Sequence, residues 1–155
     1  MTSLVFTSLA VALALSQGVP ALKPDFTGTW TMDRGRSQSP ESVTLAIKQT
    51  AAEISIETNR AGSISTVNYP FEATPHAGTD AITAGHSHAY WEGTKLVTET
   101  SGNIQGQTVS FKQTRSLNAA RTEMTVDSIV IVQHGYSLGG ARNYGTAKDV
   151  YVRAK

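Results

Sequence analysis

The hydrophobic pattern is what most constrains this chain. After Leu22, no segment of the 155-residue sequence keeps the apolar period of an amphipathic helix. Short runs in which apolar and polar residues alternate recur instead, each pair separated by a short turn. Alternate residues of a β-strand lie on the same face. The pattern therefore predicts an all-β protein built from consecutive hairpins.

The predicted strands follow one another along the chain and are expected to pair in that order. They span residues 26–33, 42–50, 53–58, 63–71, 86–91, 95–100, 107–117, 122–132 and 147–154. An antiparallel meander of about eight to nine strands closes on itself readily, because closure removes exposed strand edges. We therefore predict a single antiparallel up-and-down β-barrel, with a β-sandwich as the alternative.

The N-terminal segment differs from the rest of the chain. Residues 1–21 carry no charge and include the apolar run Leu4–Leu15. That run is too short for a membrane span, which needs about 20 residues. It is typical of a signal peptide, and Val19–Ala21 supplies a small-residue cleavage site. We expect a signal peptide over residues 1–21 and a barrel domain over residues 22–155, in a secreted or periplasmic protein.

Composition excludes several classes of function. The chain has no cysteine, so disulfides, thiolate metal sites and a cysteine nucleophile are excluded. The net charge is +1, and Lys and Arg form no basic run, so we expect neither a nucleic-acid partner nor a membrane span beyond the signal peptide. No Gly-x-Ser-x-Gly or phosphate-loop motif is present, and we assign no catalytic residue. A binding protein is thus expected rather than an enzyme.

Four motifs carry a family resemblance. They are Phe26-Thr27-Gly28-Thr29-Trp30, Trp91–Val97, Ser116–Val126 and Val150–Arg153. Their order over residues 25–153 resembles that of small secreted lipocalin-like (calycin-type) β-barrel proteins of bacteria. The resemblance implies a barrel with a cavity or cleft but no settled activity. It also implies that Trp30 packs across the closed end of the barrel beside Arg153. One departure is Ala120-Arg121, where the family pattern has an Asp-Gly turn.

A closed barrel of this size can hold one small ligand. Our leading hypothesis is a secreted lipocalin-like barrel that binds a small, mainly apolar molecule. The lining residues we predict are Tyr69, Tyr90, Val97 and Phe111. The long segments 72–85 and 134–147, rich in Gly, Pro and Thr, are expected to form the rim. A protein-interaction or inhibitor module with a filled barrel is an alternative.

The sequence GHSHAYWEGTKLVTE, residues 85–99, carries a second hypothesis. A turn at Gly93 would place His88 opposite Glu99 and Tyr90 opposite Val97. His86 and His88 are two residues apart, so their side chains share one face of the strand, and both would lie near the carboxylate of Glu99.

Imidazole and carboxylate ligands suit Zn or Cu. The alternative function is therefore a metal-binding protein or metal-dependent enzyme that uses His86, His88 and Glu99, with a third histidine from His76 or His134. The simpler interpretation is a cross-strand polar pair on a solvent-facing hairpin.

Overall fold

The computed structural model describes residues 22–72, 85–104, 107–133 and 143–155. Those residues form nine β-strands and no helix. The strands are β1 (Gly28–Met32), β2 (Val43–Gln49), β3 (Glu53–Arg60), β4 (Ser63–Pro70), β5 (Ser87–Glu92), β6 (Lys95–Ile104), β7 (Gln107–Leu117), β8 (Glu123–Gln133) and β9 (Asn143–Arg153). They form one sheet in the order β4-β3-β2-β1-β9-β8-β7-β6-β5, with every pair of neighbours antiparallel.

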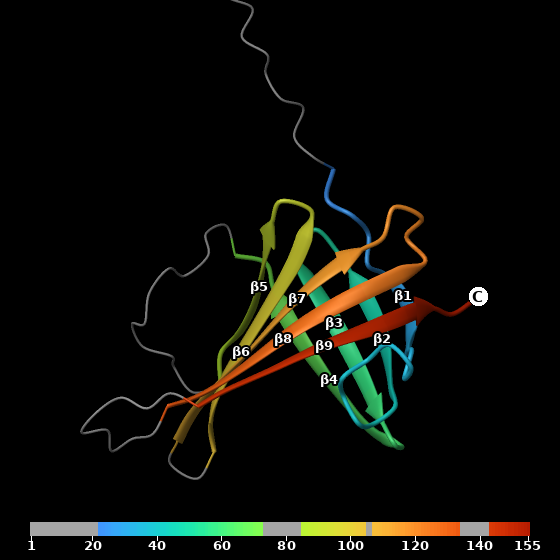
Figure 1. Ribbon diagram of the computed structural model, residues 1–155. Coiled ribbons are helices and arrows are strands. Elements are labelled where there is room, and N and C mark those ends of the chain that lie inside the picture. Colours follow the sequence, from blue (N-terminus) through green and yellow to red (C-terminus); the bar gives the residue numbers. More distant parts are fainter. Residues whose placement is uncertain (1–21, 73–84, 105–106, 134–142) are drawn as a thin grey trace, which may run out of the picture.

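The sheet curls until its two edge strands meet (Figure 1). Within the described residues, one parallel bridge between Phe71 and Ala89 joins the end of β4 to β5. The amide of Glu72 donates to the carbonyl of Ala89 at 2.9 Å, directly beside that bridge. The result is a nearly closed antiparallel barrel. The predicted barrel is therefore confirmed over the β-sandwich alternative.

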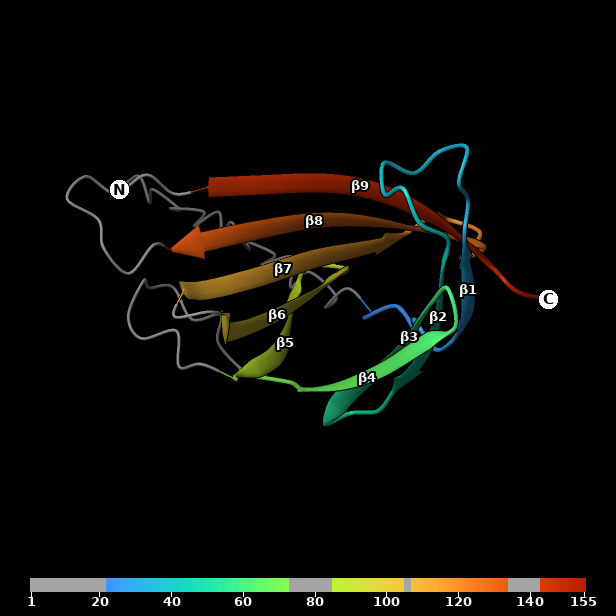
Figure 2. The same cartoon turned by 90° about the horizontal axis from the view of Figure 1, so that it is seen from below.

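The barrel has two halves that face each other across its interior. In Figure 2, the sheet formed by β6–β9 lies on one side and β3 and β4 lie on the other. The strands of the two halves cross steeply in Figure 1. Side chains from both halves fill the interior at one end.

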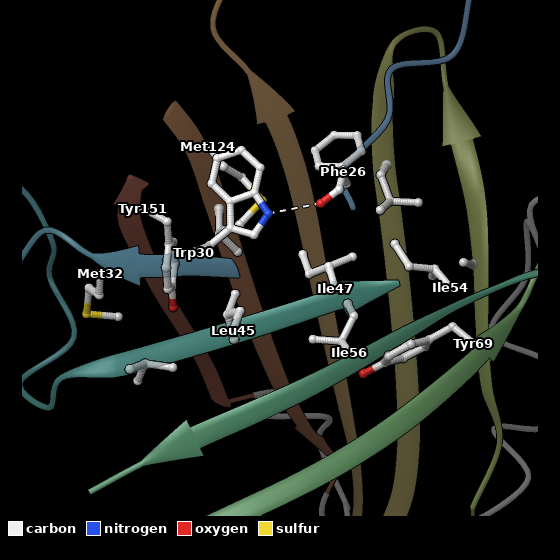
Figure 3. Packing of buried hydrophobic residues seen from close by; sticks show 14 residues of the cluster. Phe26, Trp30, Met32, Leu45, Ile47, Ile54, Ile56, Tyr69, Met124 and Tyr151 are labelled. Carbon is white, nitrogen blue, oxygen red and sulfur yellow. Dashed lines mark hydrogen bonds between the residues drawn. The ribbon is translucent and has the colours of Figure 1, made fainter. Parts of the chain in front are cut away.

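That filled end is built around Trp30, which is fully buried (Figure 3). Its indole Nε1 donates a hydrogen bond of 2.9 Å to the carbonyl of Phe26. The guanidinium of Arg153 lies 4.4 Å above the indole ring and donates to the carbonyl of Thr27 at 2.7 Å. The packing of Trp30 beside Arg153, implied by the family resemblance, is confirmed.

The β7–β8 turn forms without Asp-Gly. Arg121 adopts a φ of 56°, the left-handed conformation that glycine usually supplies. The side-chain oxygen of Asn118 accepts hydrogen bonds from the amides of Thr122 and Glu123 at 2.9 and 3.1 Å. These bonds hold the turn in place of the missing glycine.

One boundary differs clearly from prediction. The last strand begins at Asn143, inside the predicted loop 134–147, because the backbone of β9 pairs with β8 from Val132 onward. Glycine and small polar residues in that part of the chain gave no strand pattern. The predicted signal peptide lies outside the described residues. In the part of the chain that the structure describes, no helix is long and apolar enough to cross a membrane.

Candidate functional site

Two adjoining pockets occupy the unfilled part of the barrel interior, with volumes of about 320 and 380 Å³. They share five lining residues, so they form one continuous cavity. The shared residues are Val43, Arg60, Phe111, Gln113 and Tyr151. The wall combines aliphatic and aromatic side chains with many polar ones, chiefly serine and threonine hydroxyls, Gln113 and charged groups.

The structure places the four predicted lining residues on two different faces. Tyr69 and Phe111 line the cavity. Tyr90 on β5 and Val97 on β6 are directly opposite partners. The next pair along the hairpin, Trp91 and Leu96, points into the core. Because strand neighbours alternate between faces, Tyr90 and Val97 point away from the cavity.

Arg115 is the most unusual group on the cavity wall, because its side chain is fully buried. Its Nη1 donates to Thr98 Oγ1 at 2.7 Å, and its Nη2 donates to Gln113 Oε1. Its Nε has no hydrogen-bond partner among the described residues. No carboxylate in the described part of the chain forms an ion pair with this guanidinium. Arg115 is therefore a buried cation that lacks a described counter-ion.

Burial sets the charge states near Arg115. It lowers the pKa of Arg115 to about 10, against the opposing influence of Tyr69 and Tyr151. The guanidinium thus stays charged at neutral pH. Burial also raises the pKa of Tyr151 to about 12, so its hydroxyl stays neutral. Arg115 is therefore a buried positive charge beside the neutral hydroxyl of Tyr151 on the cavity wall.

The wall also carries a buried anion, Asp149, whose charge is satisfied locally. Its Oδ1 accepts hydrogen bonds from the backbone amides of Gln38 and Ser39 at 3.0 and 2.9 Å. Its Oδ2 accepts one from the Ser39 hydroxyl at 2.5 Å. Three donors compensate this carboxylate, whereas no anionic group of the described residues pairs with Arg115.

Sequence reasoning missed Arg115. The signal is present in β7, where Phe111, Gln113 and Arg115 occupy alternate positions and so share a face. A charged residue in phase with an apolar face is uncommon, and it marks a buried group that needs a role.

The predicted register of the β5–β6 hairpin is confirmed. His88 pairs with Glu99 and Tyr90 pairs with Val97. Gly93 takes the turn position, with a φ of 62°. In the same register Glu99 lies opposite Lys112, on the face away from the cavity. The histidine face therefore lies on the outside of the barrel.

On this outer face, a different carboxylate lies closest to His86. Glu72 Oε1 lies 3.1 Å from His86 Nε2. Glu72, His86 and His88 each present one ligand atom within 4.8 Å of the other two. Glu99 is near as well, with its Oε2 3.7 Å from His88 Nε2. Because Glu72 follows β4, far from the hairpin in sequence, sequence reasoning missed it.

The carboxylate of Glu99 already has other contacts. The hydroxyl of Tyr90 donates to Glu99 Oε1 at 2.7 Å, and the ammonium of Lys112 lies 3.4 Å from the same oxygen. Glu99 thus joins the histidines to a polar network. His76 and His134, the predicted further ligands, lie outside the described residues.

Comparison with known proteins was made on sequence and on fold. No family model and no curated protein matches the sequence. Apo lipid binding protein 8 of Caenorhabditis elegans superimposes with a TM-score of 0.53 and 12% identity, covering 83% of this chain and 95% of that one.

Two further solved structures are similar at lower scores. The REP1-NXSQ fatty acid transporter has a TM-score of 0.41 and 12% identity, covering 83% of this chain and 96% of its own. Human cRBP IV has the same score and identity, covering 84% and 99%. The likeness to the nematode protein shows that the two chains share the same barrel fold.

Proposed function

We propose that the protein binds a small, mainly apolar molecule with a carboxylate head group inside its barrel. The observation that carries this proposal is Arg115, a fully buried cation on the wall of an internal cavity. A buried charge without a counter-ion is costly to the folded state. An anionic ligand would supply the missing charge.

The head group follows from the donors that Arg115 offers. A guanidinium presents five N–H groups in a planar fork that matches a carboxylate. Two of its nitrogens already donate to Thr98 and Gln113, and Nε remains available. Arg60 also lies on the cavity wall, but Glu41, 3.5 Å away, offsets its charge. Arg115 is then the cation left to balance the ligand, and one cation suits the single charge of a carboxylate better than the higher charge of a phosphate.

The body of the ligand follows from the rest of the wall. In the second pocket, the aliphatic side chains of Val43, Leu45, Ile56 and Val67 form one part of the wall, and Arg115 with several serine and threonine hydroxyls forms the rest. Such a wall favours a hydrocarbon body beside a charged head. The similar nematode protein is named for lipid binding, which supports this class of ligand. A filled barrel acting as an interaction module fits poorly with a cavity of this volume.

Filling the cavity tests the proposal. Val130 lines it, whereas its neighbour Ile129 is exposed on the other face of β8. We expect Val130→Trp to weaken binding of a fluorescent long-chain fatty acid to delipidated protein at least tenfold. The matched control Ile129→Trp should leave binding unchanged. Equal affinity of both variants, or no binding by the unmodified protein, would contradict the proposal.

We also propose that the chain is exported, on the strength of the uncharged apolar segment over residues 1–21. N-terminal sequencing of protein recovered from outside the cytoplasm tests this. A mature chain that starts near Leu22 is expected. A retained Met1 on protein from intact cells would contradict it.

A further inference from the structure

We propose that Glu72, His86 and His88 bind a divalent transition ion of the Zn²⁺ class on the outer face of the barrel, where β4 meets β5. This site is separate from the cavity, because Arg115 and Phe111 project from the opposite face of the same sheet. It does not depend on the proposed ligand.

The distances fit such an ion after small movements. Ligand atoms bound about 2.0–2.1 Å from tetrahedral zinc lie roughly 3.3 Å from one another. Glu72 Oε1 and His86 Nε2 are already 3.1 Å apart, and all three ligand atoms lie within 4.8 Å. The side chain of His86 is 52% exposed, so it has room to turn toward the ion. Three protein ligands leave a coordination position for water.

The buried histidine is held by neighbours, as metal ligands usually are. The ring of His88 stacks on Tyr90 with centroids 5.9 Å apart and an interplanar angle of 19°. Glu99 Oε2 lies 3.7 Å from His88 Nε2. The hydroxyl of Tyr90 fixes the same carboxylate at 2.7 Å. These contacts orient the imidazole before an ion arrives.

The local charge also favours a cation. Two carboxylates, those of Glu72 and Glu99, lie beside the histidine rings, and the ammonium of Lys112 lies 3.4 Å from Glu99. These two negative charges and one positive charge leave a net charge of −1 beside the imidazoles. Imidazole ligands select a transition ion over Mg²⁺ or Ca²⁺, which prefer oxygen.

The position of the site gives it a structural consequence. Glu72 lies two residues after the end of β4, whereas His86 immediately precedes β5 and His88 lies within it. Among the described residues, a single bridge and the hydrogen bond from Glu72 to Ala89 join the backbones at this seam, beside the stacking of Phe71 on Trp91. An ion bound to all three side chains would cross-link the two edges of the sheet and stabilise the closed barrel.

Calorimetric titration of tag-free protein with ZnCl₂, followed by thermal unfolding, tests the proposal. We expect one ion per chain. At zinc concentrations about a hundredfold above Kd, the Tm should rise by roughly 5–10 °C. Exchange of the Glu72 amide, measured by NMR, should slow when zinc binds.

Variants identify the ligands. His86→Ala and Glu72→Gln change exposed or half-buried groups, so both should fold. Each should weaken zinc binding at least tenfold and abolish the Tm shift. Glu57→Gln, an exposed glutamate on β3, is the charge-matched control and should bind as the unmodified protein does.

Three results would overturn the proposal. Unchanged affinity in both variants would show that zinc binds elsewhere. Loss in His86→Ala with full binding in Glu72→Gln would describe a lone surface histidine rather than a site across the two strands. MgCl₂ that competes equally with zinc would contradict the assignment to a transition ion.

Discussion

Replacing Arg115 with methionine separates the two consequences of a buried cation. Methionine has a similar length and no charge, so it keeps most of the packing and removes the guanidinium. We expect Arg115→Met to leave the stability of the unliganded protein nearly unchanged and to weaken binding of a carboxylate ligand strongly.

The stability change has two opposing parts. Burial lowers the pKa of Arg115 to about 10, and at ~1.4 kcal/mol per pKa unit this destabilises the folded cation by about 3 kcal/mol. The folded-state pKa lies below the unfolded value, so this destabilisation is fully present below pH 10, including at neutral pH. Loss of the bonds that the charged guanidinium donates to Thr98 and Gln113 costs about 1.5 kcal/mol each, at the low end for a charged donor. The two parts nearly cancel, so the unfolding free energy of the unliganded variant should change by less than about 1 kcal/mol.

The binding change depends on the head group. A hydrogen bond to a charged group contributes about 1.5–3 kcal/mol, so losing it should raise the Kd of a fatty acid roughly 10- to 100-fold. The corresponding fatty alcohol has the same hydrocarbon body and no charge. Its Kd should change less than about threefold on the same substitution.

Urea unfolding gives the stability, and calorimetric titration at pH 7 gives both affinities. Arg34→Met, at an exposed arginine in the loop after β1, is the control for the loss of one positive charge. Equal losses for acid and alcohol would show that Arg115 shapes the cavity without reading the head group. Unchanged fatty-acid binding would refute the charge argument entirely.

Three further predictions concern the scaffold. Trp30→Phe removes a buried indole and its hydrogen bond to a backbone carbonyl, and should lower the urea-derived unfolding free energy by about 2–3 kcal/mol. Arg121→Gly relieves the left-handed φ of 56° and should raise that free energy by about 0.5–1 kcal/mol. Hydrogen bonds from Arg36 lower the pKa values of Asp33 and Glu123 below 3.8 and 4.5, so their stabilisation is present at neutral pH and lost as pH falls through the lowered values. Arg36→Ala should therefore show a smaller fall in Tm between about pH 5 and pH 2.

Local patterns predicted much of this fold. The alternation around Trp91 and Leu96, together with a glycine at the turn, was enough to give the register of the β5–β6 hairpin, which is confirmed. These features act over a few residues, where strand periodicity and turn chemistry decide the structure. The packing of Trp30 against Arg153 joins the first and last strands of the chain, and only the family resemblance pointed to it.

The candidate sites depend on contacts that local patterns do not contain. Glu72 reaches His86 because the sheet closes at Phe71 and Ala89, which is a property of the whole barrel. To predict a role for Arg115, one would need to know that its face of β7 lines a cavity and does not face solvent. In both cases the role of a polar residue depends on segments that are distant from it in sequence and that only the closed barrel brings near.

The placement of Tyr90 shows why aromatic character alone misleads in a barrel. Both faces of the β5–β6 hairpin carry buried apolar side chains. Leu96, on the inward face, and Val97, on the outward face, are both fully buried. Burial alone therefore does not show which face lines the cavity. The paired residue on the neighbouring strand β7 does show it. Leu96 pairs with Arg115, and Val97 pairs with Thr114 on the outer face. The inward side chains of this hairpin thus border the proposed ligand cavity, and its outward side chains form part of the histidine cluster. Because each side chain points to one face only, a mutation can alter one proposed site without touching the other.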